Sequence, residues 1–249
     1  MSAPETYEVY AIRYATIARK PGENFILGDP HETSSNLDYF IWLVRSDRRL
    51  FIVDTGFNAQ GAARRGRSFL TPPAEGLARM GIDAAQVEDV IITHLHYDHV
   101  GGFEQFPAAR FHLQDDEMGY ATGRFMTHGF FNHAYEVDEV VAMVRHVYKG
   151  RVEFHDGDAQ LAPGLSVHRI GGHTKGLQCG LPQAGTILGL CKNYCQQYCY
   201  QTAAVRRSRR RRERCHPADS ARAESATRSF QVPAATSTRQ PEISTIVRS

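Results

Sequence analysis

The 249-residue sequence contains no long apolar segment. No run approaches the about 18 apolar residues that a membrane-spanning helix needs. The N-terminal MSAPETYEVYAIRY also lacks the basic start and the apolar stretch of a signal peptide. From these absences we expect neither a membrane span nor a cleaved leader, and we predict a cytoplasmic protein.

Cysteine is absent from the first 178 residues. All five cysteines follow Gln178, and an odd number confined to one end of a chain is a poor disulfide framework. A chain of this length can bury a core without disulfides. The simplest expectation is therefore one large α/β domain held together by packing.

Basic residues are also scarce in the first part of the chain. Residues 1–178 hold 17 Lys and Arg against 23 Asp and Glu, a net charge of −6, whereas residues 179–249 hold 12 against 4, a net charge of +8. Seven arginines lie in VRRSRRRRER at 205–214, and the residues that follow are mostly Ala, Ser, Thr and Arg. This composition predicts poor order and divides the chain into a domain, 1–178, and an atypical Arg- and Cys-rich tail, 179–249.

The first part has the apolar pattern of a β-rich α/β domain. YEVYAIRYA at 7–15, YFIWLV at 39–44 and LFIVDTG at 50–56 predict three consecutive strands. VEDVIITHLH predicts a further strand that runs up to a histidine-rich loop. RVEFHDGD and LSVHRIGGH predict two more strands, the last with His173 at its end.

Three segments between these strands have a helical pattern. AEGLARMGI at 74–82, DDEMGYA at 115–121 and YEVDEVVAMVRHVYK at 135–149 predict helices. In the last of them, one stripe is expected to carry Val137, Val140, Val141 and Val144.

THLHYDHVGG at 93–102 places four potential metal ligands within six positions. His94 and His96 alternate on an extended backbone, so both side chains can point the same way. Asp98 and His99 follow the turn and can face a second point nearby. This geometry suits two adjacent cations, and Gly101 with Gly102 is expected to let the backbone turn tightly beside them.

Imidazole and carboxylate ligands together favour zinc, although manganese, iron or cobalt suit the same set. Zinc lowers the pKa of bound water from about 16 towards about 7, so the expected reaction class is metal-assisted hydrolysis. Isolated histidines carry no such signal. We interpret the isolated histidines as core or solvated residues; they are His112, His128, His133, His146 and His155.

In these motifs the sequence resembles the metallo-β-lactamase superfamily. DTG at Asp54 to Gly56, HLHYDHVGG and GGHTKGLQ occur in the order that the family has, and the resemblance covers roughly residues 7–178. It implies an αββα sandwich in which two sheets pack face to face with helices outside. It also implies that the metal ions lie at one edge of the sheets.

Within the superfamily, the sequence around the HLHYDHVGG loop is most similar to that of N-acyl homoserine lactonases, which open the lactone ring of bacterial signals. The resemblance implies two divalent ions, zinc by preference, and a small lactone as substrate. His94, His96 and His173 would hold one ion, and Asp98 with His99 part of the other, with Asp98 assigned to catalysis as well.

The segment GRFMTHGFFNHAY at 123–135 follows this loop and is rich in large apolar side chains. In a lactonase these side chains would line a groove for the acyl chain. The residues assigned to this groove are Phe125, Met126, Phe130 and Phe131.

The family has two further ligands after His173, a bridging aspartate and a later histidine. TILGLCKNY at 186–194 stands where the aspartate is expected and reads Gly189, Leu190, Cys191. We do not transfer the bridging role to Cys191, although a thiolate can bind zinc. Beyond His173 the sequence has one aspartate, Asp219, and one histidine, His216. We hypothesise that the tail is read out of frame from a gene that once encoded an ordinary family member.

Three other interpretations stay open. The same fold could carry a glyoxalase II-like thioesterase, an esterase or an amidase, or the chain could be a non-catalytic remnant that binds one ion or none. The arginine run could bind nucleic acid, which we disfavour because no aromatic platform accompanies it.

Overall fold

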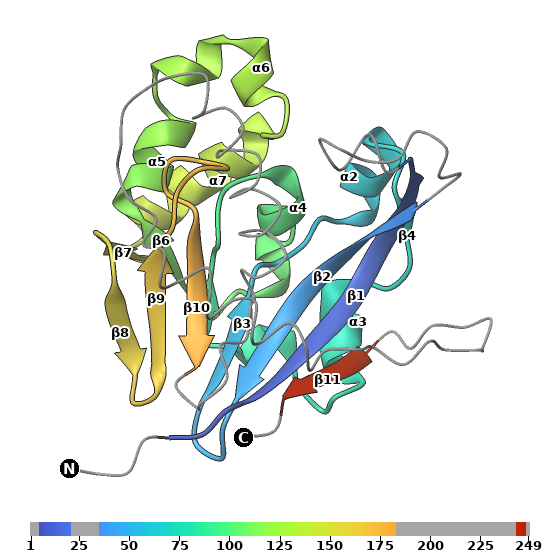
Figure 1. Ribbon diagram of the computed structural model, residues 1–249, viewed down its shortest axis with the longest axis vertical. Coiled ribbons are helices and arrows are strands. Elements are labelled where there is room, and N and C mark those ends of the chain that lie inside the picture. The colour runs from blue at the N-terminus through green and yellow to red at the C-terminus, as the bar shows by residue number, and fades with distance from the viewer. Residues whose placement is uncertain (1–4, 21–34, 183–242, 248–249) are drawn as a thin grey trace, which may run out of the picture.

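The computed structural model describes residues 5–20, 35–182 and 243–247, and these form two β-sheets with helices (Figure 1). The larger sheet contains β1 (Glu8–Arg19), β2 (Ser35–Arg45), β3 (Leu50–Val53), β4 (Ser68–Phe69), β5 (Asp89–Ile91), β6 (Arg110–Gln114), β7 (Val152–His155) and β11 (Ile243–Val247). The smaller sheet contains β8 (Ala159–Ala162), β9 (Leu165–Arg169) and β10 (Gln178–Pro182).

The strand order of the larger sheet is β11-β1-β2-β3-β5-β6-β7, with β4 also paired to β1, and that of the smaller sheet is β10-β9-β8. β1, β2 and β3 pair antiparallel, whereas β3, β5, β6 and β7 pair parallel. Parallel neighbours end at the same edge of the sheet. The loops that follow β3 and β5 therefore meet there.

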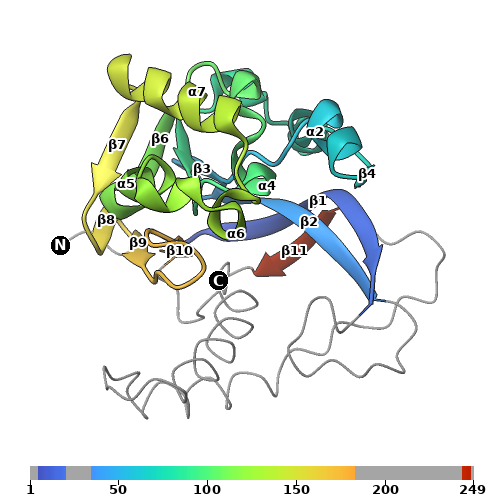
Figure 2. The same ribbon diagram turned by 90° about the horizontal axis from the view of Figure 1, so that it is seen from above.

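Helices cover the face of the larger sheet that the smaller sheet leaves open (Figure 2). None of the helices among the described residues is long and apolar enough to cross a bilayer. The helices are α2 (Ala59–Arg64), α3 (Pro73–Ala78), α4 (Tyr97–Val100), α5 (Asp115–Ala121), α6 (Gly129–Asn132) and α7 (Val137–Tyr148), and the 3-10 turns are η1 (Ala84–Gln86), η2 (Phe103–Gln105) and η3 (Arg124–Thr127).

Alternate residues of the central strands face two separate cores. In β3, Ile52 packs into the core beneath the helices, whereas Phe51 and Val53 pack between the two sheets against Leu165 and Val167. Because both faces of β3 are covered, an uninterrupted apolar run fits there without alternation. The expected α/β arrangement of two facing sheets with outer helices is confirmed.

Two helices match their predicted ranges closely, but only part of the predicted valine stripe is buried. α5 has the predicted bounds, and α7 begins at Val137 and ends at Tyr148. The buried residues of α7 are Val140 and Met143, whereas Val137 is 76% exposed and Val141 37% exposed. Met143 sets the buried face, and Val141 lies about 160° from it around a helix of 3.6 residues per turn.

The strand expected over VEDVIITHLH ends early, at Ile91. The backbone N–H of Thr93 donates to the Asp54 carboxylate over 2.8 Å, and that of Leu95 donates to Glu117 over 2.9 Å. Because side-chain carboxylates accept these N–H groups, the chain leaves the ladder before the histidines. His173 likewise lies in the loop after β9 and not in the strand.

The boundary predicted at residue 178 falls at the first residue of β10, and β11 pairs antiparallel with β1. The arginine run, Cys191, His216 and Asp219 lie outside the described residues, as does nearly all of the segment proposed to be out of frame.

Candidate metal centre

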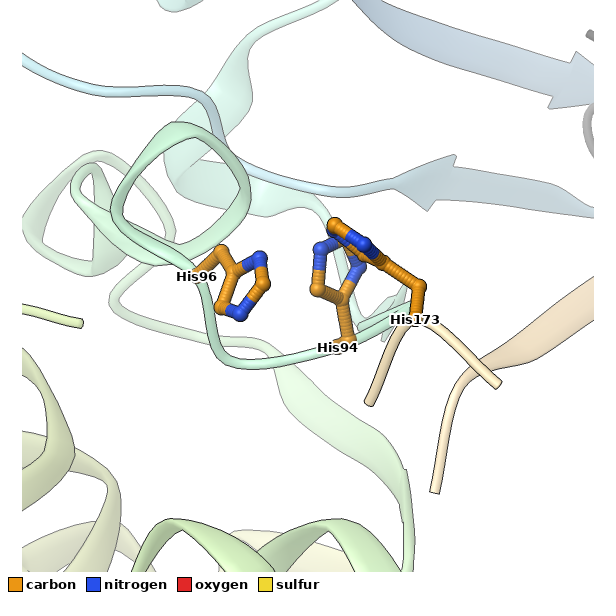
Figure 3. A group of neighbouring side chains, drawn as sticks. All are labelled: His94, His96 and His173. Carbon is orange, nitrogen blue, oxygen red and sulfur yellow. The ribbon is translucent and has the colours of Figure 1, made fainter. Parts of the chain in front are cut away.

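Three histidine side chains from two distant loops meet at one edge of the sheets (Figure 3). His94 and His96 follow β5, and His173 lies between β9 and β10. The ring centroids are 4.6 Å apart for His94 and His96, 4.8 Å for His94 and His173, and 4.5 Å for His96 and His173. One ligand nitrogen of each lies within 4.8 Å of the others. The structure thus brings together the three residues that the sequence assigned to one ion.

All three imidazoles are held in the form that binds a metal. Burial lowers the pKa of His94 and His96 well below the ordinary value, and neighbouring histidines lower it further. Burial and the nearby His99 lower the pKa of His173 to about 4. Neutral histidine nitrogens are zinc ligands. The donor set therefore fits a divalent ion of the zinc class.

Asp98 and His99 form the other half of the group, on the short helix α4. His99 Nε2 lies 3.4 Å from Asp98 Oδ2, and the rings of His99 and His94 are 4.0 Å apart. Burial alone would lower the pKa of His99, but Asp54 and Asp98 outweigh it and raise the pKa to about 10. Burial would likewise raise the pKa of Asp98, yet His99 lowers it below its usual range. A positive charge between these two carboxylates is thus stabilised.

Asp54 fixes the orientation of His99. Its Oδ2 lies 2.7 Å from His99 Nδ1, and its carboxylate also accepts from the Thr93 N–H over 2.8 Å and the Thr93 hydroxyl over 2.9 Å. The backbone of Asp54 has a φ of 63°, the left-handed region that Asp tolerates better than most residues. A carboxylate on one ring nitrogen leaves the other nitrogen to face a ligand. The DTG motif pointed to this position, but not to its contact with His99.

Glu117 joins the two loops that carry the histidines. Oε1 accepts from the Leu95 N–H over 2.9 Å, and Oε2 accepts from the Gly176 N–H over 3.1 Å and from the Thr174 hydroxyl. Leu95 separates His94 from His96, and Thr174 follows His173. This fully buried carboxylate therefore holds both loops in register, a role that no sequence motif indicated.

Glycines near the site are required by close packing. The backbone turns at Gly101 and Gly102 as predicted, but their φ angles of −79° and −130° are open to any residue. A Cβ on Gly102 would instead lie 2.6 Å from the Thr55 carbonyl oxygen. A Cβ on Gly176 would lie 2.1 Å from the Glu117 nitrogen. Glycine is needed where the backbones approach each other.

A row of aromatic rings leads from the histidines to the surface. His96 lies 4.7 Å from Tyr135, Tyr135 lies 6.4 Å from Tyr120, and Tyr120 lies 5.6 Å from Phe125, measured between ring centroids. Phe125 in turn lies 5.8 Å from Phe131. The sequence indicated Phe125 and Phe131, but it gave no sign that two tyrosines connect them to His96.

The four groove residues predicted from the sequence differ in their surroundings. Phe125 and Phe131 are 44% and 40% exposed and contact each other, whereas Phe130 is 81% exposed and projects furthest into solvent. Met126 is half-buried and packs against the core beneath the helices. Phe125 and Phe131 are therefore the better placed pair to meet a ligand.

Two arginines pack around the residue between His96 and Asp98. The Arg65 guanidinium lies 4.1 Å from the centroid of the Tyr97 ring, and Arg67 Nε donates to the Tyr97 hydroxyl over 3.1 Å. The Tyr14 hydroxyl donates to the Asp98 carbonyl over 2.7 Å. These contacts hold α4 in place. The bridging aspartate and last histidine of the family would fall among residues outside the described ranges.

Comparisons with known proteins agree with this arrangement. The family model of the metallo-β-lactamase superfamily matches residues 37–183. The N-acyl homoserine lactonase AiiB of Agrobacterium fabrum is 26% identical over 180 residues, which cover 62% of this chain and 65% of that protein. The probable metallo-hydrolase Rv2300c of Mycobacterium tuberculosis is 32% identical over 85 residues, 29% of this chain and 27% of that protein.

Solved structures show the same fold at low sequence identity. A quorum-quenching N-acyl homoserine lactone lactonase superposes with a TM-score of 0.58 at 20% identity, covering 73% of this chain and 70% of the other. AidC, a dizinc quorum-quenching lactonase in complex with a homoserine product, gives a TM-score of 0.55 at 18% identity over 75% and 70% of the two chains. The two-sheet fold, the matched family model and the gathered histidines lead to one conclusion: this chain belongs to the metallo-β-lactamase superfamily.

Proposed function

We propose that this chain is a metal-dependent hydrolase that opens the lactone ring of N-acyl homoserine lactones. The observation that carries the proposal is the gathering of His94, His96 and His173 beside Asp98 and His99. The similarity to AiiB and to lactonase structures supports the lactone as substrate.

His94, His96 and His173 would hold one divalent ion, and Asp98 with His99 would hold part of a second, zinc being the expected metal. Such ions, when bound, polarise a carbonyl oxygen and lower the pKa of bound water towards about 7. Asp54 accepts the Nδ1 proton of His99, so that Nε2 faces Asp98 and the site. Asp98, held ionised by His99, acts both as ligand and as the carboxylate nearest the reaction.

The aromatic row supports an acyl-chain substrate. Phe125 and Phe131 present apolar surface, and Tyr120 and Tyr135 continue it to His96. An acyl chain laid along these rings would bury apolar area and place its ester end at the histidines. A headgroup without the chain would lose this contribution to binding.

The test uses the full chain loaded with Zn²⁺ and N-hexanoyl homoserine lactone. Hydrolysis adds water across the ester bond, giving a hydroxy acid whose carboxyl group releases a proton that can be titrated. His96→Ala is expected to abolish proton release and to lower the zinc content, because a ligand is lost. His128→Ala removes an exposed histidine in η3–α6 and should leave both unchanged. Lactone opening that survives in His96→Ala would contradict the proposal.

Other hydrolases of this fold are separated by substrate. The same loaded chain is offered a glutathione thioester, an aryl ester and a β-lactam amide. A kcat/KM for the thioester, the ester or the amide that exceeds the value for the lactone would replace the proposed substrate with that one. A chain that keeps no more zinc than His96→Ala and opens nothing would be the non-catalytic remnant.

A further inference from the structure

Two further histidines are buried on the opposite face of the larger sheet from the helices. His112 on β6 is 3% exposed and His155 on β7 is 8% exposed. Their rings are nearly parallel, 8° between planes, and His112 Nδ1 lies 3.2 Å from His155 Nε2. Neither residue belongs to the centre described above.

These histidines stand in a buried layer that holds apolar side chains and also the hydrogen-bonded pair Gln114 and Gln178. Phe111 and Leu113, which flank His112 along β6, face the helices. His112 therefore faces the space between the sheets, where its ring lies 6.4 Å from the Phe51 ring. Burying an imidazole there costs free energy unless both ring nitrogens are satisfied. His112 therefore depends on His155 and Asp89 for its ring hydrogen bonds.

Asp89 determines which nitrogen of His112 faces its partner. Asp89 Oδ1 lies 3.0 Å from His112 Nε2, so it accepts that proton and leaves the Nδ1 lone pair directed at His155. Burial alone would raise the pKa of Asp89, but hydrogen bonds from His112 and Arg110 lower it, so the carboxylate is ionised. Burial also lowers the pKa of His155, which keeps that imidazole neutral.

Glu153 brings a carboxylate to the same point. The parallel register pairs it with His112 across the two strands, and one ligand atom each of His112, Glu153 and His155 lies within 4.8 Å of the others. Its side chain is 45% exposed, so it can adjust and leaves a path from solvent. Arg110 contacts one of its oxygens over 3.3 Å, which leaves the second oxygen to act as a ligand.

We propose that His112, Glu153 and His155 form a second metal site, for a divalent ion of the zinc class, with Asp89 orienting His112. Tetrahedral zinc with Zn–N bonds of about 2.0–2.1 Å places two ligand nitrogens roughly 3.3–3.4 Å apart. The 3.2 Å between the two imidazoles already matches that spacing. The ion takes the place of the hydrogen bond between His112 Nδ1 and His155 Nε2, whose proton moves to the other nitrogen of the His155 ring so that this imidazole stays neutral. The ion then links β6 to β7, so its role is structural. The site goes beyond the proposed hydrolase activity.

The test measures zinc content of the full chain after stripping with a chelator, re-equilibration with Zn²⁺ and gel filtration. His155→Gln is expected to hold one zinc ion fewer than wild type. His168→Gln is the matched control, because His168 lies on β9 beside Asp158 at 2.9 Å and belongs to neither group of potential ligands among the described residues. It should hold as much zinc as wild type. Equal zinc in His155→Gln and wild type would overturn the site.

A second variant separates this result from the fate of the proposed hydrolase. His96→Ala removes a ligand of the first centre, and adding His155→Gln to it should still remove one further ion. His155→Gln alone should keep the lactone hydrolysis of wild type. The difference of one ion is expected even if the chain opens no lactone.

Two measurements keep the proposal testable if His155→Gln does not fold. Glu153→Gln changes a half-exposed side chain and should weaken zinc binding at least about tenfold in competition with a chelator, and Asp89→Asn about 10- to 100-fold. In wild type, the imidazole ¹⁵N resonances of His112 Nδ1 and His155 Nε2 should shift when Zn²⁺ is added. Resonances that stay unmoved at saturating zinc would overturn the site.

Discussion

The two histidine groups of this chain are built in opposite ways. His94, His96 and His173 lie on loops beyond the strand ends, whereas His112 and His155 lie on the strands themselves. We refer to the first three, together with the adjoining Asp98 and His99 on α4, as the loop group, and to the other two as the strand group. The loop group has its ligands positioned by buried carboxylates from other elements, while the strand group takes its spacing from the register of β6 and β7.

This difference has a functional consequence. Ligands on loops can converge from distant segments and leave one side of the site open, as a reacting centre requires. The two histidines on paired strands are buried and held at a fixed spacing by the strand register, which suits an ion that only joins strands. The comparison therefore predicts that changes to Asp54 and Glu117 affect the loop group alone.

The largest effect is expected from Asp54→Ala. The substitution removes the acceptor for His99 and for both polar groups of Thr93. Loss of such an orienting carboxylate lowers metal affinity by about 10- to 100-fold, and the buried donors left without an acceptor cost about 1–3 kcal/mol each. Lactone hydrolysis and urea unfolding measure the two effects. The matching control is the strand group, which should keep its zinc ion in Asp54→Ala. Adding His155→Gln to Asp54→Ala should therefore remove one further ion.

Glu117→Gln should have the next largest effect. The amide keeps the shape of the side chain but turns an N–H₂ group towards backbone N–H or hydroxyl donors of Leu95, Thr174 and Gly176. We expect a loss of about 2 kcal/mol in the free energy of unfolding, with a lower kcat because His173 moves relative to His96. Glu104→Gln, at an exposed position, is the control. Unchanged kcat and stability in Glu117→Gln would show that the two loops are held by other contacts.

The metal-free protein should show a pH dependence that comes from the loop group. His99 has a folded pKa of about 10, above the ordinary 6.5, so its contribution to stability is complete below pH about 6.5 and is lost as the pH rises towards 10. His173 has a folded pKa of about 4, so its neutral form favours folding above pH about 6.5, and that stability is lost as the pH falls towards 4.

Urea unfolding in the presence of a chelator at pH 5, 6.5 and 9 measures both losses. His99→Gln should remove most of the alkaline loss, and His173→Gln should reduce the acid loss. An alkaline loss of the same size in His99→Gln would contradict the assignment.

The smallest effect is expected from the aromatic row. Phe131→Ala removes a 40% exposed ring next to Phe125, so stability should change by less than about 1 kcal/mol. The KM for a decanoyl lactone should rise about three- to tenfold, while the KM for a butanoyl lactone stays the same. Tyr148→Ala, which removes an 89% exposed ring on α7, should change neither. Equal KM shifts for both lactones would show that the Phe131 ring does not bind the acyl chain.

The parts of the site that could be predicted from the sequence are those set by local spacing. His94, His96, Asp98 and His99 stand within six residues, so a strand end followed by a turn brings them together whatever surrounds them. His173 was found through the order of motifs that the family resemblance supplied. Helices such as α5 were found because a few adjacent residues set their ends.

The parts that could not be predicted depend on contacts between residues far apart in the chain. Glu117 on α5 accepts hydrogen bonds from Leu95 and Thr174, which are 22 and 57 residues away in the chain, and the sequence around Glu117 does not indicate these contacts. His112 and His155 were interpreted singly as core or solvated residues, since only the parallel register of β6 and β7 makes them neighbours.

By itself, the sequence determined the α/β class and the first four potential ligands, because apolar periodicity and short spacings are local properties, and the superfamily followed from the resemblance of its motifs to that family. The tertiary structure alone decided that Asp54 orients His99, that Glu117 joins two loops and that a second pair of histidines faces one point. These depend on backbone hydrogen bonds and strand register, which are fixed only when the whole sheet has formed.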